Sequence, residues 1–168
     1  VLTALEIVKD DAVPTLFMAG DSTVGDPRRG PGGNWPTQLC QFLKPEIAVC
    51  NSAEGGETSK SFITGQRLDK VLSQMKAGDF FLIQFAHNDM KAGANHLEPA
   101  TGYRQYREKF IVEARARGAT PVLVTSMHRR RFDREHLERL FFAVLVDAEV
   151  RGGQVPHGPA GGVVRDDA

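Results

Sequence analysis

Four short apolar segments, separated by stretches in which apolar residues recur at helical spacing, constrain the fold of this chain most strongly. The four segments cover residues 14–19, 47–50, 80–85 and 121–125. Segments of this length, bordered by glycine or proline, predict buried strands. The stretches between them carry their apolar residues on one face of a helix. Strands that alternate with helices predict right-handed βαβ units built around a parallel sheet.

Three helices are expected between these strands. The first follows Asn34 and ends before Pro45, the second covers residues 68–75, and the third covers residues 103–114 and ends at Gly118. Proline near a helix start and glycine after a helix end are typical signals. After Asp133 the pattern is ambiguous, because residues 135–150 fit an amphipathic helix while residues 141–146 fit a fifth strand.

Composition limits the partners of such a domain. Lys plus Arg equals Asp plus Glu at 21 each, so no overall charge would attract nucleic acid or an anionic membrane surface. The longest apolar run is far shorter than a bilayer span. One packed domain is expected over residues 1–150, followed by a Gly/Pro-rich tail over residues 151–168. Cys40 and Cys50 are interpreted as small core residues rather than as a disulfide.

Polar residues of chemical interest follow each predicted strand. The four loops cover residues 20–23, 51–60, 86–89 and 126–133. Loops after the carboxyl ends of parallel strands gather at one edge of the sheet, where ligands bind. The sequence therefore predicts a functional site built from these four loops.

Ser22 stands in the first of these loops, within Gly20-Asp21-Ser22-Thr23. A strand-to-helix turn exposes a serine hydroxyl and supplies backbone N–H groups to an oxyanion, as a nucleophile requires. The ordinary G-x-S-x-G elbow is absent because Val24 occupies its last position, which disfavours an α/β-hydrolase. Taken alone, Ser22 is equally compatible with a residue that only caps a turn.

Gly56 and Asn88 occupy the loops after the second and third strands. A glycine lets the backbone approach a ligand, and an asparagine amide donates to an oxyanion without adding a charge. Each also has a simple structural interpretation, as one of two glycines in a loop and as part of an Asn-Asp turn. Their order along the chain and their common sheet edge favour a role shared with Ser22.

Together these residues resemble the first three sequence blocks of the SGNH (GDSL) hydrolases. The blocks are Gly20-Asp21-Ser22, Gly56 and His87-Asn88-Asp89. Further residues resemble the rhamnogalacturonan acetylesterase branch, which removes acetyl groups from pectic polysaccharide: Gly20 to Thr23, Asn34-Trp35, Ser59 to Phe62, Gly65, Arg67-Leu68, Phe85 to Asp89 and Arg129 to Arg131. The resemblance extends over residues 14–133.

This resemblance implies both a fold and a chemistry. The fold is an α/β, flavodoxin-like three-layer α/β/α sandwich with a parallel sheet. The chemistry is that of a serine esterase with no metal and no cofactor, in which Ser22 is the nucleophile and Gly56 and Asn88 contribute to the oxyanion hole. The substrate is an acetylated carbohydrate or a small ester, and family members commonly act outside the cell. The sequence gives no indication of the oligomeric state.

The general base of the family is where this sequence departs from the pattern. The family places it in an Asp-x-x-His block near the C-terminus, after a fifth strand. Asp133-Arg-Glu-His136 has this spacing but comes too early, and His157 comes at the right place but has Gln154 where the Asp is expected. The favoured interpretation is that no working base is present; if a base operates, His136 oriented by Asp133 is the first choice and His157 is the second. The chain after Asp133 is therefore interpreted as truncated, rearranged or frame-shifted, and this part of the fold as incomplete or irregular.

Three functions follow from these interpretations. The first is an esterase that removes acetyl groups from a carbohydrate, with weak or impaired activity because the base does not match. The second is a non-catalytic domain of the same family that at most binds a carbohydrate. The third is a flavodoxin-like phosphate or nucleotide binder, which is disfavoured because the chain has no G-x-x-x-x-G-K-[ST] or G-x-G-x-x-G motif.

Overall fold

A four-stranded parallel sheet forms the centre of the computed structural model, which describes residues 12–26, 34–127, 132–133 and 136–137. In spatial order its strands are β2 (Ala48–Asn51), β1 (Thr15–Gly20), β3 (Phe80–Gln84) and β4 (Thr120–Leu123). β1 pairs with both β2 and β3, so that Phe17 is level with Cys50 and Phe81. The predicted parallel sheet is confirmed, and the four predicted strands are all found at their expected places.

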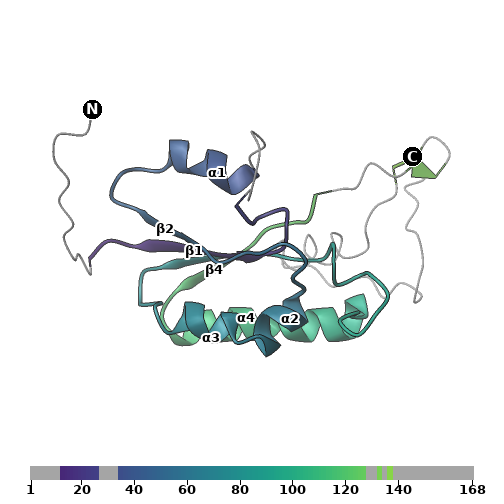
Figure 1. Cartoon of the computed structure of the whole chain (residues 1–168). Coiled ribbons are helices and arrows are strands. Elements are labelled where there is room, and N and C mark those ends of the chain that lie inside the picture. The colour runs from purple at the N-terminus through teal and green to yellow at the C-terminus, as the bar shows by residue number, and fades with distance from the viewer. Residues whose placement is uncertain (1–11, 27–33, 128–131, 134–135, 138–168) are drawn as a thin grey trace.

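Helices cover both faces of this sheet (Figure 1). On one face lie α1 (Trp35–Leu39) and the short 3₁₀ helix η1 (Cys40–Phe42). On the other face lie α2 (Ser59–Thr64), α3 (Arg67–Leu72) and α4 (Arg104–Ala116), and the π-helical turn η2 (Pro99–Tyr103) leads into α4. The expected α/β fold with three layers is therefore present.

The strand order creates a topological switch point between β1 and β3. From β1 the chain moves outward to β2, and it then passes back across β1 to reach β3 and β4 on the other side. Open α/β sheets bind their ligands at such points, outside the carboxyl ends of the strands. The loops after β1 and β3 flank this point, and they carry Ser22 and Asn88.

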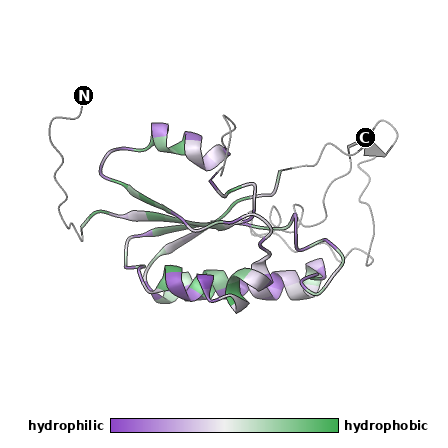
Figure 2. Ribbon diagram, in the orientation of Figure 1, coloured by the Kyte–Doolittle hydropathy of each residue, from purple (hydrophilic) through white to green (hydrophobic). Residues whose placement is uncertain are grey.

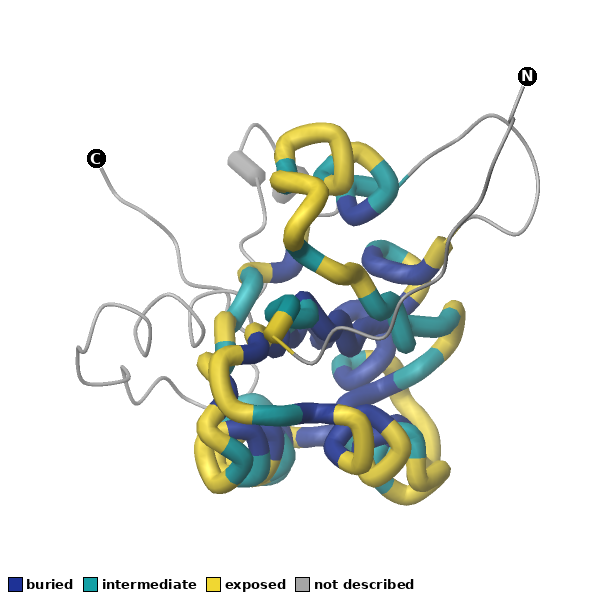
Figure 3. Tube along the Cα trace, turned by 90° about the vertical axis from the view of Figure 1, so that its left-hand side faces the viewer, coloured by how far each residue is buried: buried dark blue, intermediate teal, exposed yellow. Residues whose placement is uncertain are grey.

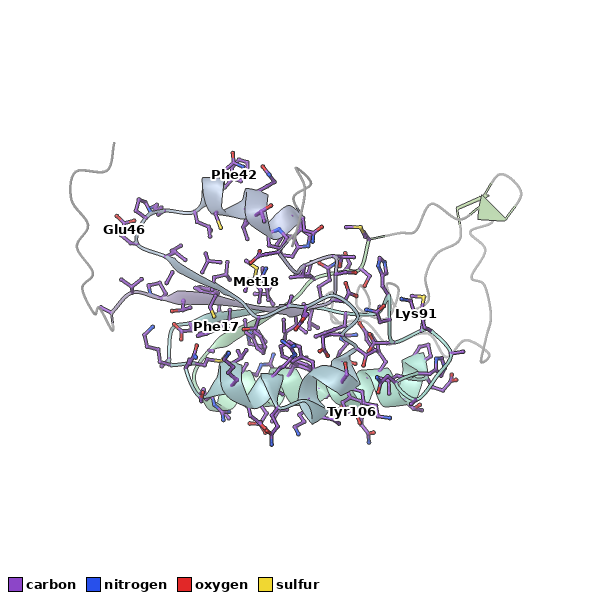
Figure 4. All side chains as sticks on the ribbon, viewed as in Figure 1. Phe17, Met18, Phe42, Glu46, Lys91 and Tyr106 are labelled. Atoms are coloured by element: carbon purple, nitrogen blue, oxygen red, sulfur yellow. The ribbon has the colours of Figure 1, made fainter. Side chains whose placement is uncertain are left out.

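Alternate residues of β1 pack into different layers, as the two-residue repeat of a strand requires. Phe17 and Ala19 belong to the core shared with α2, α3 and α4, whereas Leu16 and Met18 pack with residues of α1. Figure 4 shows Phe17 and Met18 on opposite sides of the sheet. The strands are mostly hydrophobic, while the helices carry hydrophobic and hydrophilic residues side by side (Figure 2). Buried segments accordingly gather in the middle of the molecule (Figure 3).

Three phenylalanine rings connect the larger core to the end of β3. Phe110 of α4 lies 5.8 Å from Phe62 of α2 and 5.5 Å from Phe85, measured between ring centroids, and Phe62 lies 5.5 Å from Phe85. All three residues are at most 1% exposed. Edge-to-face and tilted ring pairs at these distances are favourable beyond simple burial of apolar area. α2 and α4 are thus fixed next to the residues that follow β3.

Two expectations about the first helix, those for Cys40 and Phe42, are wrong. Cys40 is exposed and is not a core residue as expected, whereas Cys50 of β2 is partly buried and packs against the larger core; both are free thiols, as expected. Phe42, expected on the apolar face of the helix, is 82% exposed and points away from the sheet (Figure 4). The reason is that α1 ends at Leu39 and continues as a 3₁₀ turn, whose three-residue repeat changes the direction of the following side chains.

The helix α2 occupies part of what was expected to be a loop over residues 51–60. Its start is fixed by Thr58, whose side chain accepts a hydrogen bond from Ser61 N at 2.9 Å, while Thr58 N donates to Ser61 Oγ at 2.9 Å. This reciprocal arrangement is a capping box with serine in the place of the usual Glu or Gln. The apolar stripe alone could not reveal this helix, because α2 is only six residues long.

The C-terminal expectations fall largely outside the described residues. This holds for the ambiguous helix or fifth strand from residue 138 onward, for the domain boundary at residue 150 and for the tail. β5 (Phe132–Asp133) and β6 (His136–Leu137) form a separate two-stranded antiparallel pair. Figure 1 shows this pair apart from the four-stranded sheet.

A buried carboxylate residue, Asp79, connects the N-terminal ends of β1, β3 and β4. Its Oδ1 accepts hydrogen bonds from Thr15 N at 2.8 Å and from the Lys76 ammonium at 2.7 Å, and its Oδ2 accepts one from Lys76 N at 2.8 Å. Its backbone carbonyl accepts another from Thr120 N at 2.9 Å. Burial opposes ionisation, but the bonds from Lys76 and Thr15 and the positive charge of Lys76 together lower the pKa of Asp79 below 3.8. The ionised carboxylate therefore stabilises the fold.

We expect Asp79→Asn to lower the free energy of unfolding by about 1–3 kcal/mol at neutral pH, because an amide cannot accept all three side-chain hydrogen bonds. The folded pKa of Asp79 lies below its unfolded value. Its contribution is therefore complete above the unfolded pKa and is lost as the pH falls through the folded pKa. The difference between the two proteins in urea unfolding should shrink accordingly between about pH 5 and about pH 2.

The matched control is Asp69→Asn, because Asp69 is an exposed carboxylate on α3. It should change the free energy of unfolding by no more than about 0.5 kcal/mol at either pH. A penalty for Asp79→Asn that stays constant down to low pH would show that the ionised carboxylate does not carry the effect.

Candidate active site

The turn after β1 presents Ser22 to solvent. Asp21 is buried next to it, and its Oδ1 accepts hydrogen bonds from Thr23 N and Thr23 Oγ1, both at 2.8 Å. Val24 N and Gly25 N both donate to Asp21 O, at 3.0 and 2.9 Å. Asp21 thus fixes the turn with its side chain and its carbonyl, while Ser22 itself stays exposed. An exposed hydroxyl on a fixed turn suits a nucleophile.

Gly20 leaves no room for a side chain at the start of this turn. A Cβ on this residue would lie 2.7 Å from Gln84 O and 2.5 Å from Val24 Cγ2. Both distances are far below van der Waals contact, so β1 can approach the end of β3 this closely only with glycine. The first glycine of the Gly-Asp-Ser-Thr pattern is therefore required by packing.

Asn34 and Trp35 support the turn from the start of α1. Asn34 Nδ2 donates to Ser22 O at 2.8 Å. Trp35 Nε1 donates to Gln84 Oε1 at 2.9 Å, and Gln84 Nε2 donates to Thr23 Oγ1 at 3.1 Å. The Asn34-Trp35 pair thus immobilises the backbone of the Ser22 turn through one direct contact and one relayed contact.

The loop after β2 lies directly beside the Ser22 turn. Glu54 N donates to Gly20 O at 3.2 Å, and a Cβ on Gly55 would lie 3.7 Å from Ser22 Cβ. Gly56 follows with a φ of +89°, a backbone conformation that favours glycine, and it is exposed. The structure thus brings Gly55, which the sequence did not single out, next to Ser22, and Gly56 is the following residue in the same loop.

Asn88 joins the same loop from the end of β3. Its Nδ2 donates to Glu57 O at 2.9 Å, one residue beyond Gly56, and its Oδ1 accepts a hydrogen bond from the Lys91 ammonium at 2.6 Å. An amide nitrogen carries two hydrogens, so a second donor remains on Asn88 besides the one given to Glu57. The three predicted residues Ser22, Gly56 and Asn88 therefore come from three loops that contact one another.

The backbone directly after β3 is strained. Ala86 has a φ of +137°, in a region that residues with a side chain rarely adopt. The carbonyl of the preceding Phe85 accepts a hydrogen bond from Ser126 Oγ, and His87 Nε2 lies 2.7 Å from Met127 O. These two contacts hold the strained segment against the loop that follows β4. Such strain is common at functional sites, where the surrounding structure imposes it.

Asp89 is a buried carboxylate that connects the second and third loops. Its Oδ1 accepts hydrogen bonds from Ser59 N at 2.8 Å and Ser59 Oγ at 2.5 Å. Its Oδ2 is also buried, and it has no hydrogen-bond partner in the part of the chain that the structure describes. Burial raises the pKa of Asp89 above 3.8, the bonds from Ser59 oppose this, and the negative charge of Asp21 adds to the rise. Since Ser59 opens α2, Asp89 fixes the helix that follows the Gly56 loop.

The structure does not place the predicted base relative to Ser22. Asp133 and His136 are backbone partners across the β5–β6 pair, and only their backbone belongs to the described part. The alternative base, His157, lies outside the described residues. The predicted nucleophile, Ser22, and the predicted oxyanion residues, Gly56 and Asn88, thus lie in the described part of the chain, while the position of the predicted base relative to them stays a prediction.

The groups around Ser22 are hydroxyl, amide and backbone N–H groups, which suit acyl transfer. Residues 12–26, 34–127 and the β5–β6 pair contain no cluster of three or more His, Cys, Asp or Glu residues that could hold a metal ion. Over the same residues, no helix has both the length and the apolar character that a membrane span requires.

Sequence reasoning missed Lys91 and the supporting role of Asp89. Lys91 stands three residues after Asn88, a spacing that brings side chains together in a helical turn. Asp89 is adjacent to Asn88, and the sequence places it in a turn and in the third family block but gives it no role, because burial of a carboxylate cannot be recognised from its neighbours in sequence. The spacing between Asn88 and Lys91 is visible in the sequence, whereas the burial of Asp89 is visible only in the fold.

No protein-family model matches this chain. Rhamnogalacturonan acetylesterase RhgT of Bacillus subtilis is 40% identical over 120 residues, which cover 70% of this chain and 51% of that protein. The chain spans about half the length of the curated relatives it matches.

Solved structures share the fold. The Bacillus subtilis protein YxiM superposes with a TM-score of 0.67 at 22% identity, covering 83% of this chain and 42% of that chain. AlinE4, an esterase of the SGNH-hydrolase family, superposes with a TM-score of 0.59 at 18% identity, covering 87% of this chain and 76% of that chain. At these identities the superpositions establish a common fold and no more.

If Asn88 is an oxyanion donor as predicted, Asn88→Ala should lower kcat for hydrolysis of an aryl acetate by about 10²–10³, with KM little changed, because the substitution removes that donor. The control is Asn95→Ala, since Asn95 is exposed in the following loop. It should leave both constants unchanged. A near-normal kcat for Asn88→Ala would reduce Asn88 to a turn-forming residue.

Proposed function

Because this chain belongs to the SGNH hydrolases, in the branch of the rhamnogalacturonan acetylesterases, we propose that it is a serine esterase that removes O-acetyl groups from a pectic carbohydrate. The observation that carries the proposal is the assembly around Ser22. An exposed hydroxyl stands on a turn held by Asp21 and Asn34, and the Gly56 loop and the Asn88 amide are joined beside it. This is the set of groups that acyl transfer to serine needs, apart from the base.

The proposed reaction begins with attack of Ser22 Oγ on the carbonyl carbon of the acetyl group. The carbonyl π electrons move to oxygen, and the oxyanion accepts hydrogen bonds from Ser22 N, Gly56 N and the second hydrogen of the Asn88 amide. A base takes the serine proton and passes it to the departing sugar oxygen, which leaves acetyl-serine. Water then attacks the acetyl-serine, and acetate is released as Ser22 regains its proton.

The base decides how fast this reaction runs in the present chain. His136 oriented by Asp133 is the first candidate and His157 is the second, but neither matches the family block in both spacing and place. A serine hydroxyl is a poor nucleophile without a positioned base. This mismatch favours, as the second candidate function, a non-catalytic domain that binds an acetylated carbohydrate.

We expect a fluorophosphonate probe to label Ser22 and no other serine if any base operates. Ser22→Ala should abolish the labelling, while Ser73→Ala, which changes an exposed serine at the end of α3, should not. Mass spectrometry of the labelled peptide identifies the site. Labelling at Ser52, Ser59 or Ser61 would refute the assignment of the nucleophile.

We expect weak hydrolysis of an aryl acetate by the 168-residue chain, because the oxyanion hole alone leaves only part of the catalytic effect of a complete triad. If a base operates, His136→Ala should remove the activity and His157→Ala should not. Rates are compared at equal protein concentration, with Ser22→Ala as the blank. Turnover of many per second that survives both histidine substitutions would mean that the base has been misassigned.

A further inference from the structure

The nitrogen and the oxygen of the Asn88 side-chain amide each have a hydrogen-bond partner, and neither partner can act as both donor and acceptor. The Glu57 carbonyl can only accept a hydrogen bond and the Lys91 ammonium can only donate one. A flipped amide would place two donors together at Lys91 and two acceptors together at Glu57. The bonds of 2.9 Å and 2.6 Å therefore fix one orientation, in which Nδ2 faces the Gly56 loop. Because Asn88 is 8% exposed, water has little access to replace either partner.

Lys91 reaches Asn88 because the chain turns tightly after β3. Met90 N donates to Ala86 O and Lys91 N donates to Asn88 O, both at 3.1 Å. Lys91 lies beyond the carboxyl ends of the strands, on the side where the functional loops gather (Figure 4). Lys91 is exposed to solvent, so its charge costs little to maintain, while its ammonium donates to the buried Asn88 amide.

The two glutamates of the Gly56 loop, Glu54 and Glu57, are engaged elsewhere. Glu57, whose carbonyl bonds Asn88, forms an ion pair through its side chain with Arg67 Nε at 3.1 Å and also accepts a hydrogen bond from Ser61. Glu54 pairs with the same arginine. The positive charge of Lys91 at the Asn88 amide is therefore not neutralised by these two glutamates.

We propose that Lys91 is a positioning residue of the oxyanion hole, which orients and polarises the Asn88 amide. An ammonium bonded to the amide oxygen draws electron density toward that oxygen, so that the N–H groups become stronger donors. A donor that is already oriented needs no rearrangement when the oxyanion forms. The catalytic part of this inference rests on the proposed function, while the orientation of the amide does not.

The alternative is that Lys91 is an ordinary surface lysine whose contact has no consequence. The chain offers a matched control, because Lys60 lies on the adjacent α2 and donates instead to a backbone carbonyl, Ala94 O, at 2.9 Å. Lys60→Met removes the same charge from the same side of the molecule without touching Asn88. Lys91→Arg keeps a cation that can donate, and Lys91→Met removes it.

The first measurement is aryl acetate hydrolysis by the full chain and its variants. Lys91→Met should lower kcat about tenfold with KM changed less than about twofold, since the Asn88 donor is weakened rather than removed. Lys91→Arg should restore most of kcat, and Lys60→Met should leave both constants unchanged. Equal losses in Lys91→Met and Lys60→Met would overturn the inference, because they would indicate a general effect of charge.

The second measurement does not depend on turnover. In ¹⁵N-labelled protein, the side-chain amide signals of Asn88 are identified by their loss in Asn88→Ala. Lys91→Met should shift these signals and make their exchange with water about tenfold faster, because one end of the amide is released. Lys91→Arg and Lys60→Met should leave them near their original positions. Unchanged signals in Lys91→Met would overturn the inference, whereas an unsubstituted chain without turnover would contradict only the proposed function.

Discussion

The pairing of β1 with a parallel strand on each side is the interaction on which the rest of the structure depends. It puts the ends of β1 and β3 level, with Gly20 opposite Gln84, while the last residue of β2, Asn51, lies opposite Met18. Parallel strands all end at the same edge, so each following loop starts from that edge. The close approach of Gly20 to Gln84 O then sets how near the first and third loops can come. The site is a consequence of this register before any of its side chains is considered.

Two buried aspartates at opposite edges of the sheet show how the fold separates stability from function. Asp79, at the edge where the strands begin, is surrounded by an ammonium and two backbone N–H groups, and its pKa is lowered. Asp89, at the edge where they end, receives two hydrogen bonds from Ser59, faces the charge of Asp21, and its pKa is raised. The first ionised group stabilises the fold, whereas ionisation of the second costs free energy. Asp89 and the strained backbone at Ala86 both lower the stability of the fold, and both lie at the edge where the strands end, beside Ser22 and Asn88. Such strain is common at sites that hold groups in fixed positions.

The sequence predicted the strands and the longer helices because their apolar periodicity reflects the two cores directly. It also predicted which loops would meet, since that follows from the topology of a parallel sheet alone. Periodicity failed at Phe42, where a 3₁₀ turn changes the repeat, and at α2, which is too short to show one. It could not reveal the buried state of Asp89 or the place of Gly55 against Ser22, because both depend on residues distant in the chain. Such contacts depend on how the loops pack against one another, and the periodicity of neighbouring residues in the sequence does not predict this packing.

The contacts described around Ser22, Gly56 and Asn88 come from residues 20–91, together with Ser126 and Met127. The candidates for the base all come later, at or beyond Asp133. The predicted nucleophile and oxyanion residues therefore come from one part of the chain and the predicted base from another. Under the proposed function, the oxyanion hole and substrate binding would retain some acceleration without a working base. The sheet and the loops after β1, β2 and β3 position Ser22, Gly56 and Asn88, whereas the candidates for the base follow β4 in the chain.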